Sequence, residues 1–176
     1  GTVEFCRKNR VRYYIVGNGS NLLVSDEGYQ GVIIQLGKEL GEIRIKGDSV
    51  TAQAGARLSV IANQAMEADL TGFEFASGIP GTLGGACVMN AGAYGGEMRD
   101  VLTEITALTP EGDVIRIPKE QMELGYRTSI VSRKEYIVLE ACMQLKKGNR
   151  QEIQAQMEEL REKRVSKQPL EYPSAG

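Results

Sequence analysis

The amino-acid sequence predicts an α+β fold in which short strands, many of them antiparallel, pack with three helices of moderate length. Residues 42–46 alternate, with Ile43 and Ile45 on one face and charged residues on the other, which is typical of a half-exposed antiparallel strand. Apolar residues recur at helical spacing over residues 57–69 and predict an amphipathic helix that ends at Gly72. Strands and helices do not alternate regularly, so a doubly wound parallel sheet is excluded.

Apolar runs and turn residues predict the other elements along the chain. The turn at residues 110–113 joins two of the strands as a hairpin. Asn149 begins the last helix as a capping residue, and Pro169 ends it. The predicted strands cover residues 11–16, 22–24, 31–36, 50–54, 101–108, 114–117 and 136–145, and the other helices cover residues 2–9, 82–89 and 119–124.

Length and composition are those of a globular protein with a real hydrophobic core: the chain has 176 residues, of which 41% are apolar and 25% charged. A net charge of −2 without a basic stripe argues against a nucleic-acid binder, and no apolar run approaches the roughly 20 residues that cross a bilayer. There is no histidine, which excludes Ser-His-Asp and Cys-His catalysis, and no Cys-x-x-Cys pair that would suggest a metal site. Cys6, Cys87 and Cys142 are expected to be reduced core thiols of a cytoplasmic protein.

The most unusual segment is residues 77–96, in which seven of twenty residues are glycine. Glycine is costly to order, so the cluster indicates either positive φ angles or the close approach of a ligand or another backbone. Charged residues are absent between residues 77 and 96, so an anion would be held by backbone amides, foremost those of residues 81–83 at a helix start. A buried turn that packs two elements closely is an equally good interpretation of the segment alone.

A second glycine-rich turn, Gly17-Asn18-Gly19-Ser20-Asn21, separates two apolar segments. It lacks the third glycine of a dinucleotide-binding fingerprint, since position 22 is Leu22, and it lacks the Gly-Lys of a P-loop. Asn-Gly favours tight hairpin turns, so spacing alone favours a simple hairpin over a phosphate-binding loop.

Arg127 lies between Tyr126 and two small hydroxyl residues, just past a predicted helix end. Such an arginine could reach into a pocket, although residue types alone favour an exposed loop arginine.

Four segments together, in this order, carry a resemblance: residues 17–23, 77–85, 89–95 and 125–129. The sequence resembles the UDP-N-acetylmuramate dehydrogenase (MurB) family, also called UDP-N-acetylenolpyruvoylglucosamine reductases. The resemblance covers nearly the whole chain and implies a two-lobed FAD-binding fold of the vanillyl-alcohol-oxidase (PCMH) type. It implies that residues 1–36 are the remainder of the first FAD-binding lobe and residues 37–148 the second lobe. Residues 149–176 would be a connecting helix and the start of the substrate-binding domain.

The resemblance also implies site residues. The loop around the second glycine turn would hold the FAD pyrophosphate, the glycine-rich segment would line the flavin, and one residue of the late strand would touch it. The cofactor residues are Gly17, Asn18, Gly19, Ser20, Asn21, Leu22, Ile79, Pro80, Gly81, Thr82, Gly84, Gly85, Asn90, Ala91, Gly92, Ala93 and Val138; the substrate residues are Tyr94, Tyr126 and Arg127.

The family reaction implies NADPH as hydride donor, FAD as carrier and the UDP-sugar UDP-N-acetylglucosamine enolpyruvate as substrate, in peptidoglycan synthesis. Reduction builds negative charge next to a carboxylate, and Arg127 matches the family arginine that stabilises it, as a guanidinium is suited to do. The family's proton-donor serine directly follows an Ala-Gly pair that matches Ala175-Gly176, and Ser174 does not match it. Residues 1–176 alone are therefore expected not to complete turnover.

Two alternatives stay open. One is an oxidase of the same fold that uses molecular oxygen; many of these tether FAD through His or Cys, and Cys87 is the only candidate inside a motif. The other is a nucleotide-binding or interaction module without chemistry.

Overall fold

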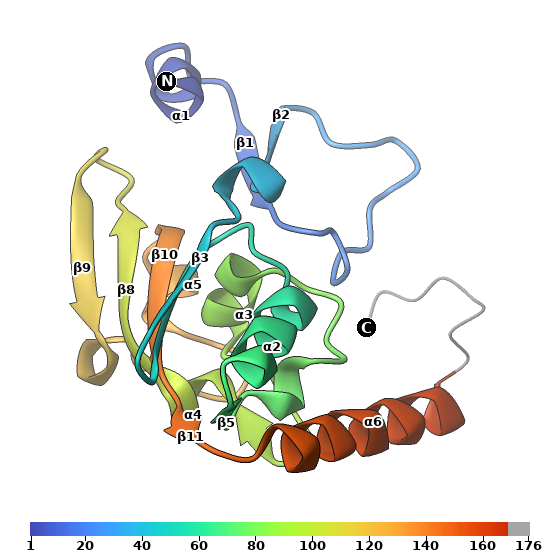
Figure 1. Ribbon diagram of the computed structural model, residues 1–176. Helices are drawn as coiled ribbons and strands as arrows, with labels where there is room; N and C mark the ends of the chain where they lie inside the picture. Colours follow the sequence, from blue (N-terminus) through green and yellow to red (C-terminus); the bar gives the residue numbers. More distant parts are fainter. Residues whose placement is uncertain (169–176) are drawn as a thin grey trace.

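The computed structural model describes residues 1–168, so the predicted helix end at Pro169 and the expectations on Ser174, Ala175 and Gly176 lie outside the described residues. Within the described part the chain is α+β, as predicted (Figure 1). Its elements form a small N-terminal group and a larger group built on a five-stranded sheet.

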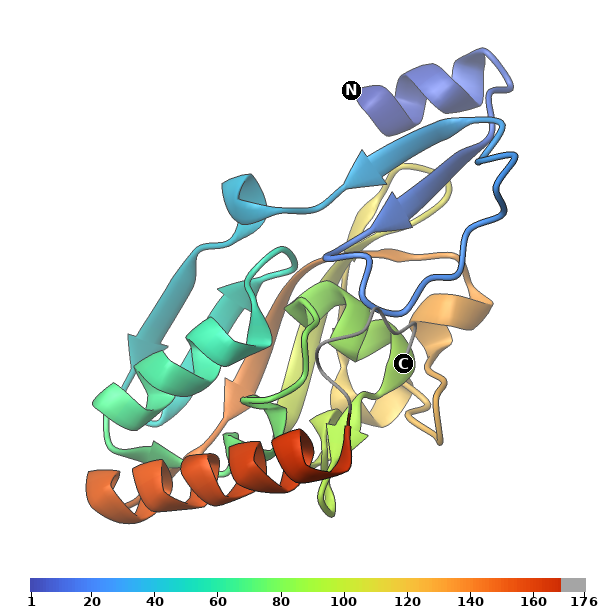
Figure 2. The same ribbon diagram turned by 90° about the vertical axis from the view of Figure 1, so that its right-hand side faces the viewer.

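The N-terminal group consists of α1 (Thr2–Lys8), β1 (Tyr13–Val16) and β2 (Val32–Gln35). β1 and β2 pair in parallel, with Tyr13 opposite Val32. The hairpin interpretation of the Gly17 turn is therefore wrong, and so is the strand predicted at residues 22–24. Parallel neighbours need a long return connection, and residues 17–31 provide it as the loop beside β1 and β2 in Figure 2.

The central sheet is antiparallel, and its strands follow the order β3-β4-β10-β8-β9. The predicted alternation is confirmed in β3, where Ile43 and Ile45 are half-buried and Arg44 is exposed. The predicted hairpin between β8 and β9 is confirmed as well. The strands are β3 (Ile43–Lys46), β4 (Ser49–Gln53), β8 (Leu102–Leu108), β9 (Val114–Pro118) and β10 (Ile137–Gln144).

Helices α2 (Leu58–Glu67) and α3 (Leu83–Met89) lie on one face of this sheet, and α3 packs against β10 (Figure 1). The apolar stripe of α2 is core, as predicted: Leu58, Ile61, Ala62 and Ala65 are buried. The end of α2 differs from the prediction, because Asp69 rather than Gly72 takes the left-handed conformation that directly follows the helix, with a φ of 58°. Aspartate tolerates this conformation, and Arg150 binds its carboxylate at 3.1 Å.

The remaining elements are short. The helix predicted at residues 119–124 is a single 3-10 turn, η3 (Lys119–Gln121), because the chain turns inward to bury Met122. The sequence did not predict α4 (Met98–Val101) or α5 (Ile130–Arg133), because four residues are too few to show a helical period. The others are η1 (Lys38–Leu40), η2 (Glu74–Ala76), β5 (Leu70–Thr71), β6 (Gly92–Ala93), β7 (Gly96–Glu97) and β11 (Lys146–Lys147).

The long helix α6 (Arg150–Lys167) closes the described part of the chain and runs along one edge of the larger group (Figure 2). Its predicted start is confirmed: the Asn149 side chain accepts hydrogen bonds from the amides of Gln151 and Glu152. Ile153 is buried, and Glu159 pairs with Lys163 at 2.5 Å, one helical turn away. α6 packs on α2, β5 and η2, so within the described residues it is attached to the larger group.

In residues 1–168 no helix is both long and apolar enough to cross a membrane. The same residues hold no group of three or more His, Cys, Asp or Glu side chains placed to bind a metal ion. All three cysteines are free, and Cys6 and Cys87 are buried as predicted, whereas Cys142 is only half-buried and is not a core thiol.

Candidate functional site

The structure brings the two glycine-rich segments together, although they are about sixty residues apart in the sequence. The Asn18 side-chain amide donates to the Pro80 carbonyl at 2.9 Å. A side chain at Gly17 would overlap the Thr82 hydroxyl, and a Cβ on Gly81 would lie 4.0 Å from the Ser20 hydroxyl. The accessible residues of the two segments therefore lie side by side: Gly19 and Asn21 are exposed, and Leu22, Ile79 and Gly81 are half-buried. Thr82 and Gly84, which were also expected to bind the cofactor, are buried.

Helix α3 begins at this surface, with Thr82 as its N-cap. The expectation that the amides of residues 81–83 point at a ligand is wrong for Leu83, whose N–H donates to the Ala56 carbonyl at 2.9 Å. The next amide, of Gly84, donates to Ala54 at 2.8 Å. The start of α3 therefore packs against the segment between β4 and α2, and the carbonyls of that segment accept hydrogen bonds from these two amides.

The paired glycines of α3 serve two different purposes. Gly84 is buried, and a Cβ there would lie 3.0 Å from the Ala54 Cβ and 3.2 Å from its carbonyl oxygen. Gly84 is therefore a packing glycine. Gly85 is exposed, and its Cβ would meet only the Thr82 hydroxyl, at 3.9 Å. At Gly85 the helix presents bare backbone to the outside, which is what close approach of a flat ligand requires.

At the other end of α3 the chain forms a second junction. Asn90 follows the helix in a left-handed conformation and donates to the carbonyl of Gly125 at 3.1 Å. Ser129, which is fully buried, donates to the carbonyl of Val88 at 2.8 Å. These bonds attach the turn that carries Arg127 to the end of α3. Two parts of the predicted site thus lie at the two ends of a helix about 10 Å long.

Arg127 lies in a tight turn closed by hydrogen bonds between Gly125 and Thr128. Its φ is +54°, a conformation that costs a residue with a side chain roughly 1–2 kcal/mol. The guanidinium lies 5.8 Å from the ring centre of Tyr126, which is 90% exposed. Strain of this kind gathers at functional sites, where the surrounding structure holds it.

An open cavity of about 300 Å³ lies in front of this turn. The hairpin β6–β7 forms one side of this cavity and the Arg127 turn the other. All three predicted substrate residues, Tyr94, Tyr126 and Arg127, line it. Its lining consists of Asn90, Gly92, Ala93, Tyr94, Gly95, Gly96, Glu97, Tyr126 and Arg127.

Not every predicted residue reaches this surface. Val138 is 2% exposed and contributes to the core under α3, and Ala91 is 8% exposed. The Asn90 side chain is 3% exposed and bonded within the chain. Any contact of these residues with a ligand would have to come from backbone atoms or from the edge of a side chain.

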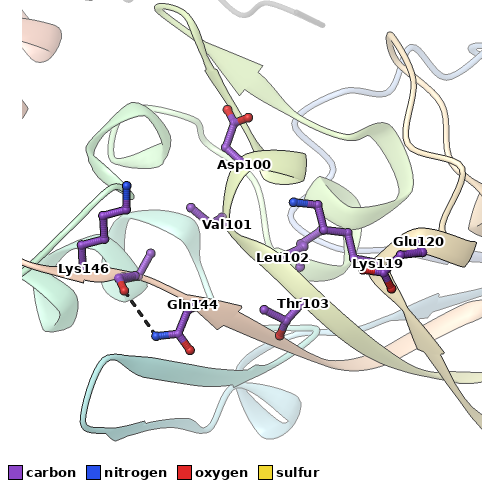
Figure 3. A pocket seen from close by; sticks show the side chains of 9 residues that line it. Asp100, Val101, Leu102, Thr103, Lys119, Glu120, Gln144 and Lys146 are labelled. Atoms are coloured by element: carbon purple, nitrogen blue, oxygen red, sulfur yellow. Dashed lines mark hydrogen bonds between the residues drawn. The ribbon is translucent and has the colours of Figure 1, made fainter.

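A second cavity, of about 320 Å³, lies between the start of β8, the end of β10 and η3 (Figure 3). Lys119 and Lys146 line it together with Asp100 and Glu120, so the charges balance. Gln144 donates to the neighbouring carbonyl of Leu145 at 3.4 Å. None of the predicted site residues lines this cavity.

The sequence analysis gave no role to Glu97, which lines the cavity, or to the Ser129 hydroxyl, which anchors the turn. Nothing in a Thr-Ser pair indicates a buried hydroxyl that anchors a turn from a distant segment. The left-handed Asn90 did leave a signal, because asparagine directly after a helix is typical of this conformation.

Cys87 lies on α3 among these residues, yet it is fully buried. Burial raises the pKa of its thiol from 9.0 to about 12, so it is a protonated, unreactive core side chain. Its position counts against a covalent tether from Cys87 to a flavin, and hence against the form of the oxidase alternative that depends on this cysteine.

This burial predicts a pH effect on stability. Between about pH 9 and pH 12 the unfolded chain loses the Cys87 proton while the folded chain keeps it, so the folded state loses stability as pH rises. The loss is up to about 1.4 kcal/mol per pH unit. Denaturant unfolding at several pH values should show a steeper decline for the wild type than for Cys87→Ala. Parallel declines would contradict the buried position of this thiol.

Comparison with known proteins agrees with the geometry. The family model described as FAD binding domain matches residues 1–118, and the chain belongs to this family of FAD-binding proteins. The predicted fold class is confirmed by solved flavoenzymes of the vanillyl-alcohol-oxidase type. One is 6-hydroxy-D-nicotine oxidase from Arthrobacter nicotinovorans, with a TM-score of 0.62 and 20% identity over 83% of this chain and 33% of the oxidase, a likeness of fold alone.

Within that class the chain is similar throughout to UDP-N-acetylenolpyruvoylglucosamine reductases, which confirms the resemblance seen in the sequence. The protein of that name from Caldanaerobacter subterraneus subsp. tengcongensis is 49% identical over 99% of this chain. The crystal structure of the reductase (MurB) from Thermus caldophilus has a TM-score of 0.83 and 35% identity over 98% of this chain. The chain spans 57% of the first relative's length and 62% of the second's.

Proposed function

We propose that the chain binds FAD along the surface that runs from the Gly17 loop over the exposed side of α3 to the cavity in front of Arg127. The observation that carries the proposal is the bare backbone at Gly85, between two clusters of predicted ligand residues at the ends of one helix. Residues 77–96 carry no charged side chain, so a flat ring system could lie against glycine and small side chains here. Membership in the FAD binding domain family supports FAD as the ligand.

In this proposal residues 17–22, with Pro80 and Gly81, hold the phosphate end of the cofactor. The Asn18–Pro80 hydrogen bond fixes the loop at this place. Gly85 would face the middle of the cofactor, and Gly92 and Ala93, which line the cavity, would lie towards its ring end. FAD supplies hydride transfer when bound, and the residues of the chain bind it, orient it and place a cation beside it.

For the whole protein we propose the reduction of UDP-N-acetylglucosamine enolpyruvate with NADPH as hydride donor, in peptidoglycan synthesis in the cytoplasm. Arg127 supports this reaction because its guanidinium is exposed at the cavity and always protonated. It can bind the enolpyruvyl carboxylate with two parallel hydrogen bonds and stabilise the negative charge that grows beside it. Tyr126 and Tyr94 line the same cavity and can pack against the sugar.

A test separates binding from turnover. The purified chain of 176 residues is saturated with FAD, reduced with NADPH without oxygen, and then mixed with either the enolpyruvyl substrate or oxygen, while flavin absorbance is followed. We expect bound flavin but no sustained substrate reduction, and we expect a full-length protein that carries this sequence to complete the reaction. Sustained turnover by the 176 residues would contradict the expected incompleteness. Rapid reoxidation of the full-length protein by oxygen alone would favour an oxidase instead.

A further inference from the structure

Asn90 holds a backbone conformation that few residues adopt, with φ 44° and ψ 52° directly after α3. Asparagine and glycine are the residues that tolerate it best. Glycine would satisfy the backbone as well as asparagine does, so the backbone alone does not account for the side chain. The side chain is 3% exposed, and a polar group so buried must be bonded.

All of its bonds go to the cavity region. The amide donates to the Glu97 carboxylate at 2.9 Å and to the carbonyl of Gly125 at 3.1 Å, and the amide oxygen accepts from the N–H of Arg99 at 2.9 Å. One side chain thus joins the end of α3, the hairpin β6–β7 with its following turn, and the Arg127 turn, which is 35 residues away.

The Arg127 turn depends on such anchors because its tip is exposed. Gly125 is held by Asn90, and Ser129 is held by the carbonyl of Val88. Between these two points Tyr126 and Arg127 project outward, and Arg127 keeps its strained φ of 54°. The hydrogen bond from the Asn90 side-chain amide to the Gly125 carbonyl joins the start of this turn to the glycine-rich segment.

The Asn90 side chain also orients the negatively charged carboxylate of Glu97. Glu97 lines the cavity with Arg127, and its carboxylate oxygens are taken up by the Asn90 amide and by Arg99 at 2.9 Å. Asn90 and Arg99 therefore orient this carboxylate, and both are partners other than Arg127, whose guanidinium is exposed at the cavity and can take an anionic substrate.

We propose that Asn90 is a positioning residue: it fixes Arg127 relative to the α3 surface and keeps Glu97 away from the guanidinium, so that cofactor and substrate are held in one geometry. The inference rests on the function proposed for Arg127. Misplacement of a catalytic group by about 1 Å can lower a rate about 100-fold, which sets the size of the effect.

Two variants of a full-length protein that carries this sequence test the proposal. Asn90→Gly keeps the left-handed backbone without strain and removes all three hydrogen bonds. Asn90→Asp keeps the acceptor for Arg99, loses the donor to Gly125 and places a second carboxylate beside Glu97. Glu135→Gly is the matched control, because Glu135 is also left-handed, with a φ of 54° against 44° at Asn90, and lies on an exposed turn outside the cavity.

In both variants we expect substrate reduction to fall about 10- to 100-fold, mainly in kcat, while FAD affinity and flavin reduction by NADPH change less than about twofold. The activity of Asn90→Asp relative to wild type should recover as pH falls, because a protonated aspartate can donate to Gly125 again. Equal losses in both half-reactions together with loss of FAD would overturn the proposal, since Asn90 would then support the flavin surface itself. Unchanged substrate reduction would also overturn it.

A second measurement keeps this inference apart from the proposed function. Hydrogen exchange of the Gly125 amide, which closes the Arg127 turn by donating to the Thr128 carbonyl at 3.0 Å, should be at least about tenfold faster in Asn90→Gly than in wild type or Glu135→Gly. Unchanged exchange overturns the positioning role whatever the enzyme does. If exchange accelerates but the wild-type protein does not reduce the enolpyruvyl substrate, the anchor is real and the proposed function is wrong.

Discussion

Replacing Arg127 with glycine is expected to abolish substrate reduction without unfolding the protein. The side chain is exposed, and its guanidinium lies over the Tyr126 ring, a contact worth about 0.5–1 kcal/mol at an exposed site. Glycine relieves the left-handed backbone strain of roughly 1–2 kcal/mol. The free energy of unfolding should therefore stay equal or rise slightly.

The loss of activity should be large. Removing one preorganised donor from a site where negative charge develops typically costs about 10²- to 10³-fold in kcat. Substrate reduction by Arg127→Gly in the full-length protein should fall by at least this factor, while FAD binding and reduction by NADPH persist. Glu135→Gly relieves the same φ and should keep full activity. Activity of Arg127→Gly within about tenfold of wild type would remove Arg127 from the mechanism.

Gly81→Val and Gly84→Val should fail in different ways. A Cβ on Gly81 would make ordinary contacts, the nearest 3.8 Å from the Leu58 side chain, so the variant should fold. A Cβ on Gly84 would press on both the Cβ and the carbonyl of Ala54, and the extra methyls of valine would add strain of about 1–3 kcal/mol or more. Gly81→Val should therefore lose cofactor, and Gly84→Val should lose stability.

Circular dichroism, thermal unfolding and FAD titration distinguish these outcomes. For Gly81→Val we expect an unchanged unfolding temperature without FAD and an FAD affinity about 100-fold lower, since a clash of about 3 kcal/mol corresponds to that factor. For Gly84→Val we expect a lower unfolding temperature even without FAD. If Gly81→Val binds FAD as the wild type does, the cofactor does not approach this backbone.

The elements with a clear period were predictable from the sequence. The alternation in β3, the apolar stripe of α2 and the cap at Asn149 were confirmed, because each depends on residues close together in the chain. The parallel pairing of β1 with β2 was missed because local turn chemistry at Gly17-Asn18-Gly19 suggests a hairpin. In the structure Gly17 does not turn the chain back into a hairpin but packs against Thr82. Residues near Gly17 in the sequence give no sign of this contact, because Thr82 is far away along the chain.

That the segments expected to form the site come together agrees with the sequence, but the contacts that join them were not predicted. The glycine-rich segments and Arg127 stand out by composition and by resemblance, and they do meet around α3. The different purposes of Gly84 and Gly85 could not be predicted, because they depend on which side of α3 faces Ala54. The anchoring of the Arg127 turn by Asn90 and Ser129 also depends on contacts between distant segments.

FAD is proposed to lie along α3, between the Gly17 loop and the Arg127 cavity. Amide chemical-shift mapping during an FAD titration of the 176-residue chain tests this position most directly. The largest shifts are expected in residues 17–22, 79–85 and 92–95. Shifts gathered instead around the cavity of Lys119 and Lys146, or no saturable shifts at all, would contradict it.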